Sequence, residues 1–181
     1  MNTLNDGEAT SARYRVPVAP QSSYGSQSST TVDGVPWLIV IGEREGLRWV
    51  IEHQRMAFRD TVKGKPSAGD PFAIYVSRGA FHNPGRDEAQ VLGLGTFKTG
   101  IERRATTVGD ERYARTARLD ISEVRPERQG LPFRPLVEDL TFIAKKSGWA
   151  AYVRQTLVPI PQADFDLIAR RLREFPKPLS Q

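Results

Sequence analysis

The densest group of chemically active side chains in this sequence follows a short apolar run. Phe72–Val76 has the composition of a buried strand, and a second apolar run begins at Val91. Five polar residues lie within the ten residues 78–87 that follow the first run: Arg78, His82, Asn83, Arg86 and Asp87. Polar donors and an aromatic ring (Phe81) on a loop between two strands suit a small planar ligand, because the ring stacks on the ligand while polar groups read its edge. The alternative is a hairpin loop in which Asn83-Pro84 and the glycines only turn the chain.

Hydrolytic and metal chemistry find little support in the same residues. Ser77, His82 and Asp87 contain the residue types of a catalytic triad, but no nucleophile elbow is present, and three such residues often share a loop by chance. The chain has two histidines and no cysteine, which argues against a metal site. His53 lies near Trp49 on an expected helix and reads as a packed or surface side chain. We therefore predict no catalytic residue, no metal and no cofactor.

Two other local patterns have structural interpretations. Gly93-Leu94-Gly95 resembles the start of a dinucleotide-binding loop, but the third glycine is misplaced and no helix pattern follows. We expect these glycines to let a sheet bend or another backbone approach closely. Glu43 and Glu45 fall at the start of an expected helix, where acidic side chains complement the helix dipole.

Composition sets the class of protein. The chain has 181 residues, of which 39% are hydrophobic and 26% charged, as in a globular protein with one core. No apolar run reaches the ~20 residues of a membrane span, and the start of the chain lacks a signal-peptide pattern, so we expect no membrane contact and a cytoplasmic location. The net charge of +5 leans toward polyanions. The densest basic stretches are Arg170–Arg173 and Arg112–Arg118, and for each alone a solvated surface is the simpler reading.

The chain divides into two parts. Residues 1–33 are rich in Ser, Thr and Gln and have too little to bury, so we predict a disordered tail. Residues 34–177 form the predicted single domain. Its expected helices are Glu43–Phe58, a short one at 136–140 and a last one between Pro161 and Pro176; its expected strands are 37–41, 71–77, 90–97, 114–124, 151–153 and 157–160. Strands that mostly follow one another, with helices at the flanks, predict an α+β domain around a curved sheet or small barrel.

The order of motifs from Trp37 onward resembles the EVE domain family, a branch of the PUA-like superfamily that is related to YTH domains. The segments that carry the resemblance are Pro36–Gly42, with its leading aromatic residue; Gly69–Ser77, followed by Val91–Gly95; and Leu140–Gln155, followed by Leu157–Ile160 and Asp164–Ile168. Leu140–Gln155 is the most specific, because it is similar to the pattern LxFI-xxK-xxW-xxYxR of stand-alone EVE-type proteins. The resemblance covers about four fifths of the chain.

The resemblance implies a fold and a function. The implied fold is a PUA-like curved mixed sheet, or small pseudo-barrel, flanked by helices. The implied function is non-catalytic: a flipped or single-stranded base of DNA or RNA, carrying a modification, enters an aromatic and polar pocket. The implied partner is therefore nucleic acid. The Trp-rich cage of YTH domains is not evident here, and the loop 78–87 is longer and more polar than in many relatives.

Carried onto this sequence, the resemblance predicts the pocket residues. They are Ile41, Gly42 and Glu43 after the first strand; Trp49, Met56 and Phe58 on the first helix; and Ser77, Arg78, Gly79, His82 and Asn83 in the loop. Phe58 or Trp49 would offer a ring face, although Phe58 could equally be core. Arg78, Arg86 and Arg154 would contact the nucleic-acid backbone, although Arg154 could instead pair with a carboxylate inside the fold.

Two other classes of function stay open at this point. One is a PUA-like enzyme acting on nucleic acid, a hydrolase using Ser77, His82 and Asp87. The other is a protein-interaction module that binds its partner through the N-terminal tail.

Overall fold

The structure is a computed structural model, and it describes residues 34–176. The predicted tail, residues 1–33, lies outside the described residues, as does residue 177 at the end of the predicted domain. Within 34–176, neither helix combines the length and the apolar character that a membrane crossing requires.

The domain contains two α-helices, two 3₁₀ helices and eight strands over the described residues. The strands are β1 (Trp37–Ile41), β2 (Arg55–Phe58), β3 (Pro71–Val76), β4 (Gln90–Phe97), β5 (Glu102–Val108), β6 (Glu111–Val124), β7 (Leu131–Pro132) and β8 (Leu157–Pro159). The helices are α1 (Arg44–His53), α2 (Gln162–Glu174) and the 3₁₀ helices Arg134–Leu136 and Lys146–Val153.

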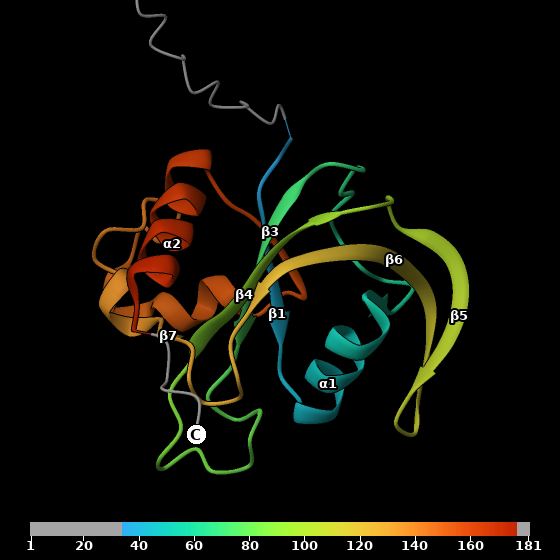
Figure 1. Cartoon of the computed structure of the whole chain (residues 1–181), viewed down its shortest axis with the longest axis horizontal. Coiled ribbons are helices and arrows are strands. Elements are labelled where there is room, and N and C mark those ends of the chain that lie inside the picture. The colour runs from blue at the N-terminus through green and yellow to red at the C-terminus, as the bar shows by residue number, and fades with distance from the viewer. Residues whose placement is uncertain (1–33, 177–181) are drawn as a thin grey trace, which may run out of the picture. The chain divides into compact units, whose positions relative to one another are not determined.

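All eight strands belong to one strongly curved sheet (Figure 1). The strand order is β2-β6-β4-β3-β1-β8, with β5 paired to β6 and β7 paired to β4. Only β1 and β3 pair in parallel, so the sheet is mixed. Helix α1 lies inside the curve that β5 and β6 make, and α2 lies on the other face. The predicted α+β class, with a curved mixed sheet flanked by helices, is confirmed.

Alternation along the strands separates two hydrophobic cores. On β1, Ile39 and Ile41 join the core under α1, while Leu38 joins the core under α2. Successive side chains of a strand point to opposite faces, so a strand that is buried on both sides must be apolar throughout. The continuous apolar runs that β1 and β3 show in the sequence follow from this position between two helical layers.

The first helix is shorter than predicted. It ends at His53, because Gln54 adopts the left-handed conformation (φ 49°, ψ 45°). Residues Arg55–Phe58 then form β2, antiparallel to β6. The helical reading was wrong there because Phe58 follows Ile51 by seven residues, which also fits a helix stripe. The side chains of Met56 and Phe58, two residues apart, share one face of β2 and enter the core under α1.

Other expected elements change character. Ala151–Val153 was expected to be a strand but belongs to the 3₁₀ helix Lys146–Val153, whose Lys146 Nζ donates hydrogen bonds to the carbonyls of Val137 (2.8 Å) and Leu140 (2.6 Å). Because the Lys146 ammonium group binds two loop carbonyls, the 3₁₀ helix is held in place without pairing to a strand. The short helix expected at 136–140 was wrong in its bounds, because the 3₁₀ helix Arg134–Leu136 shares only Leu136 with it and turns follow.

The glycines of β4 bring neighbouring strands close, as predicted. The register with β6 shifts between Leu94 and Gly95. A Cβ on Gly93 would lie 2.7 Å from the carbonyl oxygen of Glu123, and one on Gly95 would collide with the carbonyl of Asp120 and the ring of Phe72. A side chain at either position would push β6 away from β4.

Two buried carboxylates tie loops to the sheet and to α2. Asp70 accepts hydrogen bonds from the indole Nε1 of Trp37 (2.9 Å) and the backbone N of Ser67 (2.8 Å). Asp164, in the first turn of α2, accepts from the backbone N–H groups of Thr141 (2.9 Å) and Phe142 (2.8 Å). Both aspartates belong to the segments that carry the family resemblance, and here their role is to hold the fold.

Candidate functional site

A cavity of about 450 Å³ opens where β1 ends and α1 begins. Its walls come from the end of β1, the inner side of α1, β2 with the loop after it, the β5–β6 hairpin and residues 154–156 before β8. The curvature of the sheet creates it, because β5 and β6 bend around α1 instead of continuing flat. The cavity is therefore built from segments far apart in the sequence.

The floor of the cavity is apolar and rigid. Val50 of α1 and Met56, Ala57 and Phe58 of β2 line it, and all four are buried. Phe58 is only 1% exposed, so it supports the floor from within the core more than it offers a free ring face. A floor of this kind holds its shape when a ligand enters, because its side chains are already packed.

Two half-buried aromatic side chains form the walls. Trp49 of α1 lines the cavity, and its indole stacks on the ring of His53 with centroids 4.9 Å apart and an interplanar angle of 17°. Tyr113 of β6 lines the cavity from the hairpin. The sequence reasoning missed Tyr113 and Val108. Extending the alternation of Leu119 and Ile121 backwards along β6 would have placed Tyr113 on the inner face.

The Tyr113 hydroxyl belongs to a small polar network beside the cavity. It donates a hydrogen bond to Glu111 Oε2 (2.9 Å), which also accepts one from Arg59 Nη2 (3.0 Å). Burial and the hydrogen bond to Glu111 raise the pKa of Tyr113. The hydrogen bonds that Glu111 accepts from Tyr113 and Arg59 lower the pKa of Glu111. At neutral pH the phenol therefore stays protonated and the carboxylate ionised, which fixes the direction of the bond.

The tip of the hairpin returns to the start of α1. Gly109 has a φ of +57°, and a Cβ there would lie 2.5 Å from the Glu45 carboxylate. The turn can approach the helix so closely because glycine has no side chain and tolerates this conformation. This approach brings the hairpin beside the start of α1, where Val108 and Gly46 both line the cavity.

The rim of the cavity is mainly cationic. Lys63 and Arg154 are exposed at the rim, and neither makes an ion pair with a residue of the described range 34–176. Arg59 is also at the rim but is paired with Glu111 (3.0 Å). Glu43 is the one carboxylate among the cavity-lining residues that the structure describes. The rim can thus attract an anionic ligand.

The structure brings part of the predicted site together and separates the rest. The predicted residues that line the cavity are Ile41, Gly42, Glu43, Trp49, Met56, Phe58 and Arg154. The predicted residues that do not line it are Ser77, Arg78, Gly79, His82, Asn83 and Arg86. His82 approaches the rim, with Nε2 3.9 Å from Glu43 Oε2. Asn83 and Arg86 instead line a second hollow of about 540 Å³ beside Pro132.

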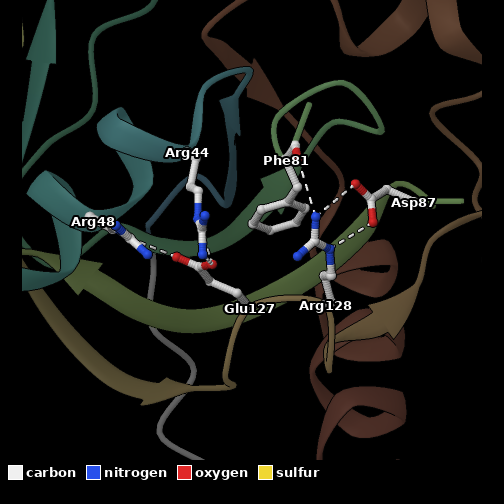
Figure 2. A network of polar contacts seen from close by, with 6 residues as sticks. All are labelled: Arg44, Arg48, Phe81, Asp87, Glu127 and Arg128. Carbon is white, nitrogen blue, oxygen red and sulfur yellow. Dashed lines mark hydrogen bonds and ion pairs between the residues drawn. The ribbon is translucent and has the colours of Figure 1, made fainter. Parts of the chain in front are cut away.

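The polar loop is held by the segment between β6 and β7 (Figure 2). Arg128 donates to both carboxylate oxygens of the buried Asp87, at 2.8 and 3.3 Å, and to the Phe81 carbonyl at 3.2 Å. Its guanidinium lies 5.1 Å from the centroid of the Phe81 ring. The hydrogen bond from Arg128 lowers the pKa of Asp87. Asp87 is thus bound by Arg128, and Phe81 is buried in the core instead of free to stack on a ligand.

The same segment also contacts α1. Glu127 accepts hydrogen bonds from Nε of Arg44 (2.7 Å) and Nε of Arg48 (2.9 Å), as Figure 2 shows. These two arginines lower the pKa of Glu127, the first of them most strongly. The adjacent residues Glu127 and Arg128 therefore connect α1 to the polar loop.

Comparison with solved structures gives a distant likeness. No protein-family model matches the chain, and no curated protein matches it. The YTH domain of the MRB1 protein of Zygosaccharomyces rouxii, solved in complex with N6-methyladenosine RNA, is similar at a TM-score of 0.49 and 11% sequence identity. The match covers 81% of this chain and 90% of that one. Membership of the EVE family stays a prediction.

Proposed function

We propose that this protein binds nucleic acid and takes one modified base, flipped or single-stranded, into the cavity at the end of β1. The observation that carries the proposal is the combination of an apolar and aromatic hollow of about 450 Å³ with two cations at its rim, Lys63 and Arg154, that lack carboxylate partners among residues 34–176. The apolar interior suits a flat heterocycle, and the rim suits the phosphates on either side of it.

The walls account for how a base would be held. Trp49 has one ring face against His53, so its other face is the one that a base can stack on. Base–aromatic stacking contributes about 1–3 kcal/mol per base. A methyl group on the base would gain about 0.8 kcal/mol from apolar contacts with the floor. Since that is a small difference, selectivity for a modification also needs contacts to the edge of the base.

Edge contacts are available beside the end of β1, where Val40 N donates a hydrogen bond to the Thr156 carbonyl (2.9 Å). The Glu43 carboxylate can accept a hydrogen bond from an amino group, while Gln155 and Thr156 can both donate and accept. The network of Glu111 and Tyr113 keeps the phenol ring in place. None of these groups needs to react, so we expect binding without turnover.

The test is a titration of the full chain with short fluorescent single strands of RNA and DNA that differ only in one base. One strand of each pair carries an unmodified adenine or cytosine and the other its methylated form. We expect a preference of at least about threefold for one modified strand, since a methyl group contributes about 0.8 kcal/mol. Equal binding of all strands would overturn the proposal of a modified-base reader.

A matched pair of variants locates the base. Trp49→Ala removes a half-buried indole from the cavity, and Trp149→Ala removes a half-buried indole from the α2 side of the sheet. We expect Trp49→Ala to weaken binding about tenfold or more, in line with the removal of one stacking partner. Trp149→Ala should keep the affinity of the unmodified protein once circular dichroism shows that it is folded. An equal reduction in both variants would contradict the placement of the base in the cavity.

A further inference from the structure

We propose a second binding surface, for the phosphate backbone of a nucleic acid, on the outer face of β2 and β6. We call it the arginine face and define it by Arg55, Arg112 and Arg118. It lies on the opposite side of the sheet from the cavity and does not rest on the function proposed for that cavity.

Register and alternation place the three arginines on one face. Arg55 of β2 pairs directly with Arg118 of β6. Their neighbours Met56 and Ala117, also a register pair, belong to the core under α1. Because successive side chains alternate between faces, Arg55 and Arg118 point to the outer side, and Arg112 follows at an even spacing on β6.

The pairing of Arg55 with Arg118 is unfavourable without a bound anion. Directly opposed side chains in an antiparallel pair have Cβ atoms roughly 5 Å apart, and like charges at that distance destabilise the pair. Neither arginine makes an ion pair within residues 34–176. The backbone of Arg118 is also fixed, since its carbonyl accepts from Lys98 N (2.8 Å) and its N–H donates to Thr99 Oγ1 (3.1 Å).

Arginines at the inner face of the same strands differ from the arginine face in that each forms an ion pair with a carboxylate. Arg115 of β6 is bound to Asp60 at 2.7 Å, and Arg59, just after β2, is bound to Glu111 at 3.0 Å. Each of these two inner arginines therefore has a carboxylate, whereas the outer ones at 55, 112 and 118 have none in the part of the chain described. The difference marks the outer face as the one that is left open for an external anion.

The surface is extended, which points to a chain of phosphates more than to a single one. Arg112 and Arg118 are about 20 Å apart along β6, at about 3.3 Å per residue. Between them the outer positions are Ala114, which is exposed, and Thr116, which is only 3% exposed, so neither carries a long side chain above the sheet. The carboxylates nearby are Glu102, opposite Thr116, and Asp120, which lies 3.8 Å from Lys98 Nζ.

No helix of the described range covers this part of the sheet. Helix α1 packs on the inner face, and α2 packs on β3 and β4 (Figure 1). Arginine forks match phosphate oxygens in geometry and bind them as bidentate pairs, which favours a nucleic-acid backbone as the occupant. An acidic protein segment is the competing occupant that the experiment must separate.

The experiment measures how binding of an unmodified 20-nucleotide single strand depends on salt. The test variant replaces Arg55, Arg112 and Arg118 by Gln in the full chain. The control variant replaces Arg134, Arg170 and Arg171 by Gln, which removes the same charge from exposed arginines elsewhere. The slope of log K against log salt should fall by about two for the test variant, because each neutralised phosphate of a single strand contributes ~0.7 to that slope. An equal fall in the control variant would overturn the proposal, because it would show only a general effect of net charge.

Three further readouts make the result specific. Arg118→Gln alone should reduce the slope by about 0.7 and should not lower the melting temperature, because it removes a repulsion. Trp49→Ala should leave the slope unchanged, which separates this surface from the cavity. Poly-glutamate should not displace the oligonucleotide from the protein when both are present at the same concentration of negative charge. Competition as strong as that of the oligonucleotide would assign the arginine face to an acidic protein segment and overturn the nucleic-acid proposal.

Discussion

The cavity at the end of β1 and the polar loop between β3 and β4 contrast in composition and in use. The loop has the richer set of side chains, with His82, Asn83, Arg86 and Asp87 within six residues. The cavity is lined mostly by apolar residues and by cations dispersed along the chain. Yet Asp87 and Phe81 of the loop are bound by Arg128, while Trp49 and Tyr113 line the cavity as half-buried aromatic walls.

The difference teaches that residue type alone does not identify a site, because the bonding groups of a polar side chain can already be occupied by the protein itself. Asp87 and Arg128 form an ion pair, and Glu127 forms ion pairs with two arginines, Arg44 and Arg48. Lys63 and Arg154 at the cavity rim have no ion-pair partner in the range 34–176, and the same holds for Arg78 and Arg86 of the loop, so the two regions differ in how Asp87 and Phe81 are bound and not in their free cations. Four sets of variants can break or sharpen this contrast between loop and cavity.

The largest effect is expected on stability, at Phe58. This ring is 1% exposed and fills the floor between α1 and β6, so Phe58→Ala should lower the free energy of unfolding by about 3–5 kcal/mol. Urea denaturation followed by circular dichroism measures it, with the half-buried Trp49→Ala as the smaller comparison. A decrease below about 1 kcal/mol at Phe58 would mean that the cavity floor is not packed core. Binding studies should use Phe58→Leu, which keeps most of the volume.

The sequence predicted the sheet well where one physical signal dominated. The continuous apolar runs of β1, β3 and β4 are typical of strands buried on both faces, and their bounds were predicted within one residue. The predicted fold class followed from the order of these strands. The hydrophobic stripe and Pro161 likewise located α2.

The candidate site was harder to predict because its geometry is non-local. The first helix stops where Gln54 turns left-handed, and nothing in the local pattern separates Phe58 from the stripe of that helix. Tyr113 reaches the cavity only because the β5–β6 hairpin bends around α1. The binding of Asp87 by Arg128 joins residues 41 positions apart, which no local pattern reveals.

The next largest effect is expected on the salt dependence of nucleic-acid binding, at the two cations of the cavity rim. Lys63→Gln with Arg154→Gln should reduce the slope of log K against log salt by about 1.4, because two phosphates of a single strand are no longer neutralised and each contributes ~0.7. Arg78→Gln with Arg86→Gln removes the same charge from exposed positions of the loop and is the matched control. Filter binding at several salt concentrations measures both. If the loop pair has the larger effect, the phosphates contact the loop and not the cavity rim.

A smaller effect, on the pH dependence of stability, tests how the loop is held. The folded-state pKa of Asp87 lies below its ordinary value because of Arg128, so their pairing stabilises the fold above that ordinary pKa, near 4. The contribution is lost as the pH falls through the lower, folded-state pKa. Arg128→Gln should therefore be destabilised most at neutral pH, and its difference from the unmodified protein should shrink below about pH 4. A difference that is constant between about pH 7 and 3, or one shared by Arg86→Gln, would show that the charge pair does not hold the loop.

The smallest effect is expected at the loop residues that do not reach the cavity. His82→Ala and Asn83→Ala change exposed side chains outside the cavity wall, so each should alter affinity for the preferred strand by less than about twofold, within the ~0.5 kcal/mol typical of surface changes. Tyr113→Ala, which removes a wall, should weaken binding about tenfold, in line with a stacking energy of about 1–3 kcal/mol. His82 is the sharper of the two loop tests, since its Nε2 lies 3.9 Å from Glu43 at the rim. If His82→Ala weakens binding as much as Tyr113→Ala, the loop closes onto the bound ligand, and the chemistry of its side chains contributes to recognition after all.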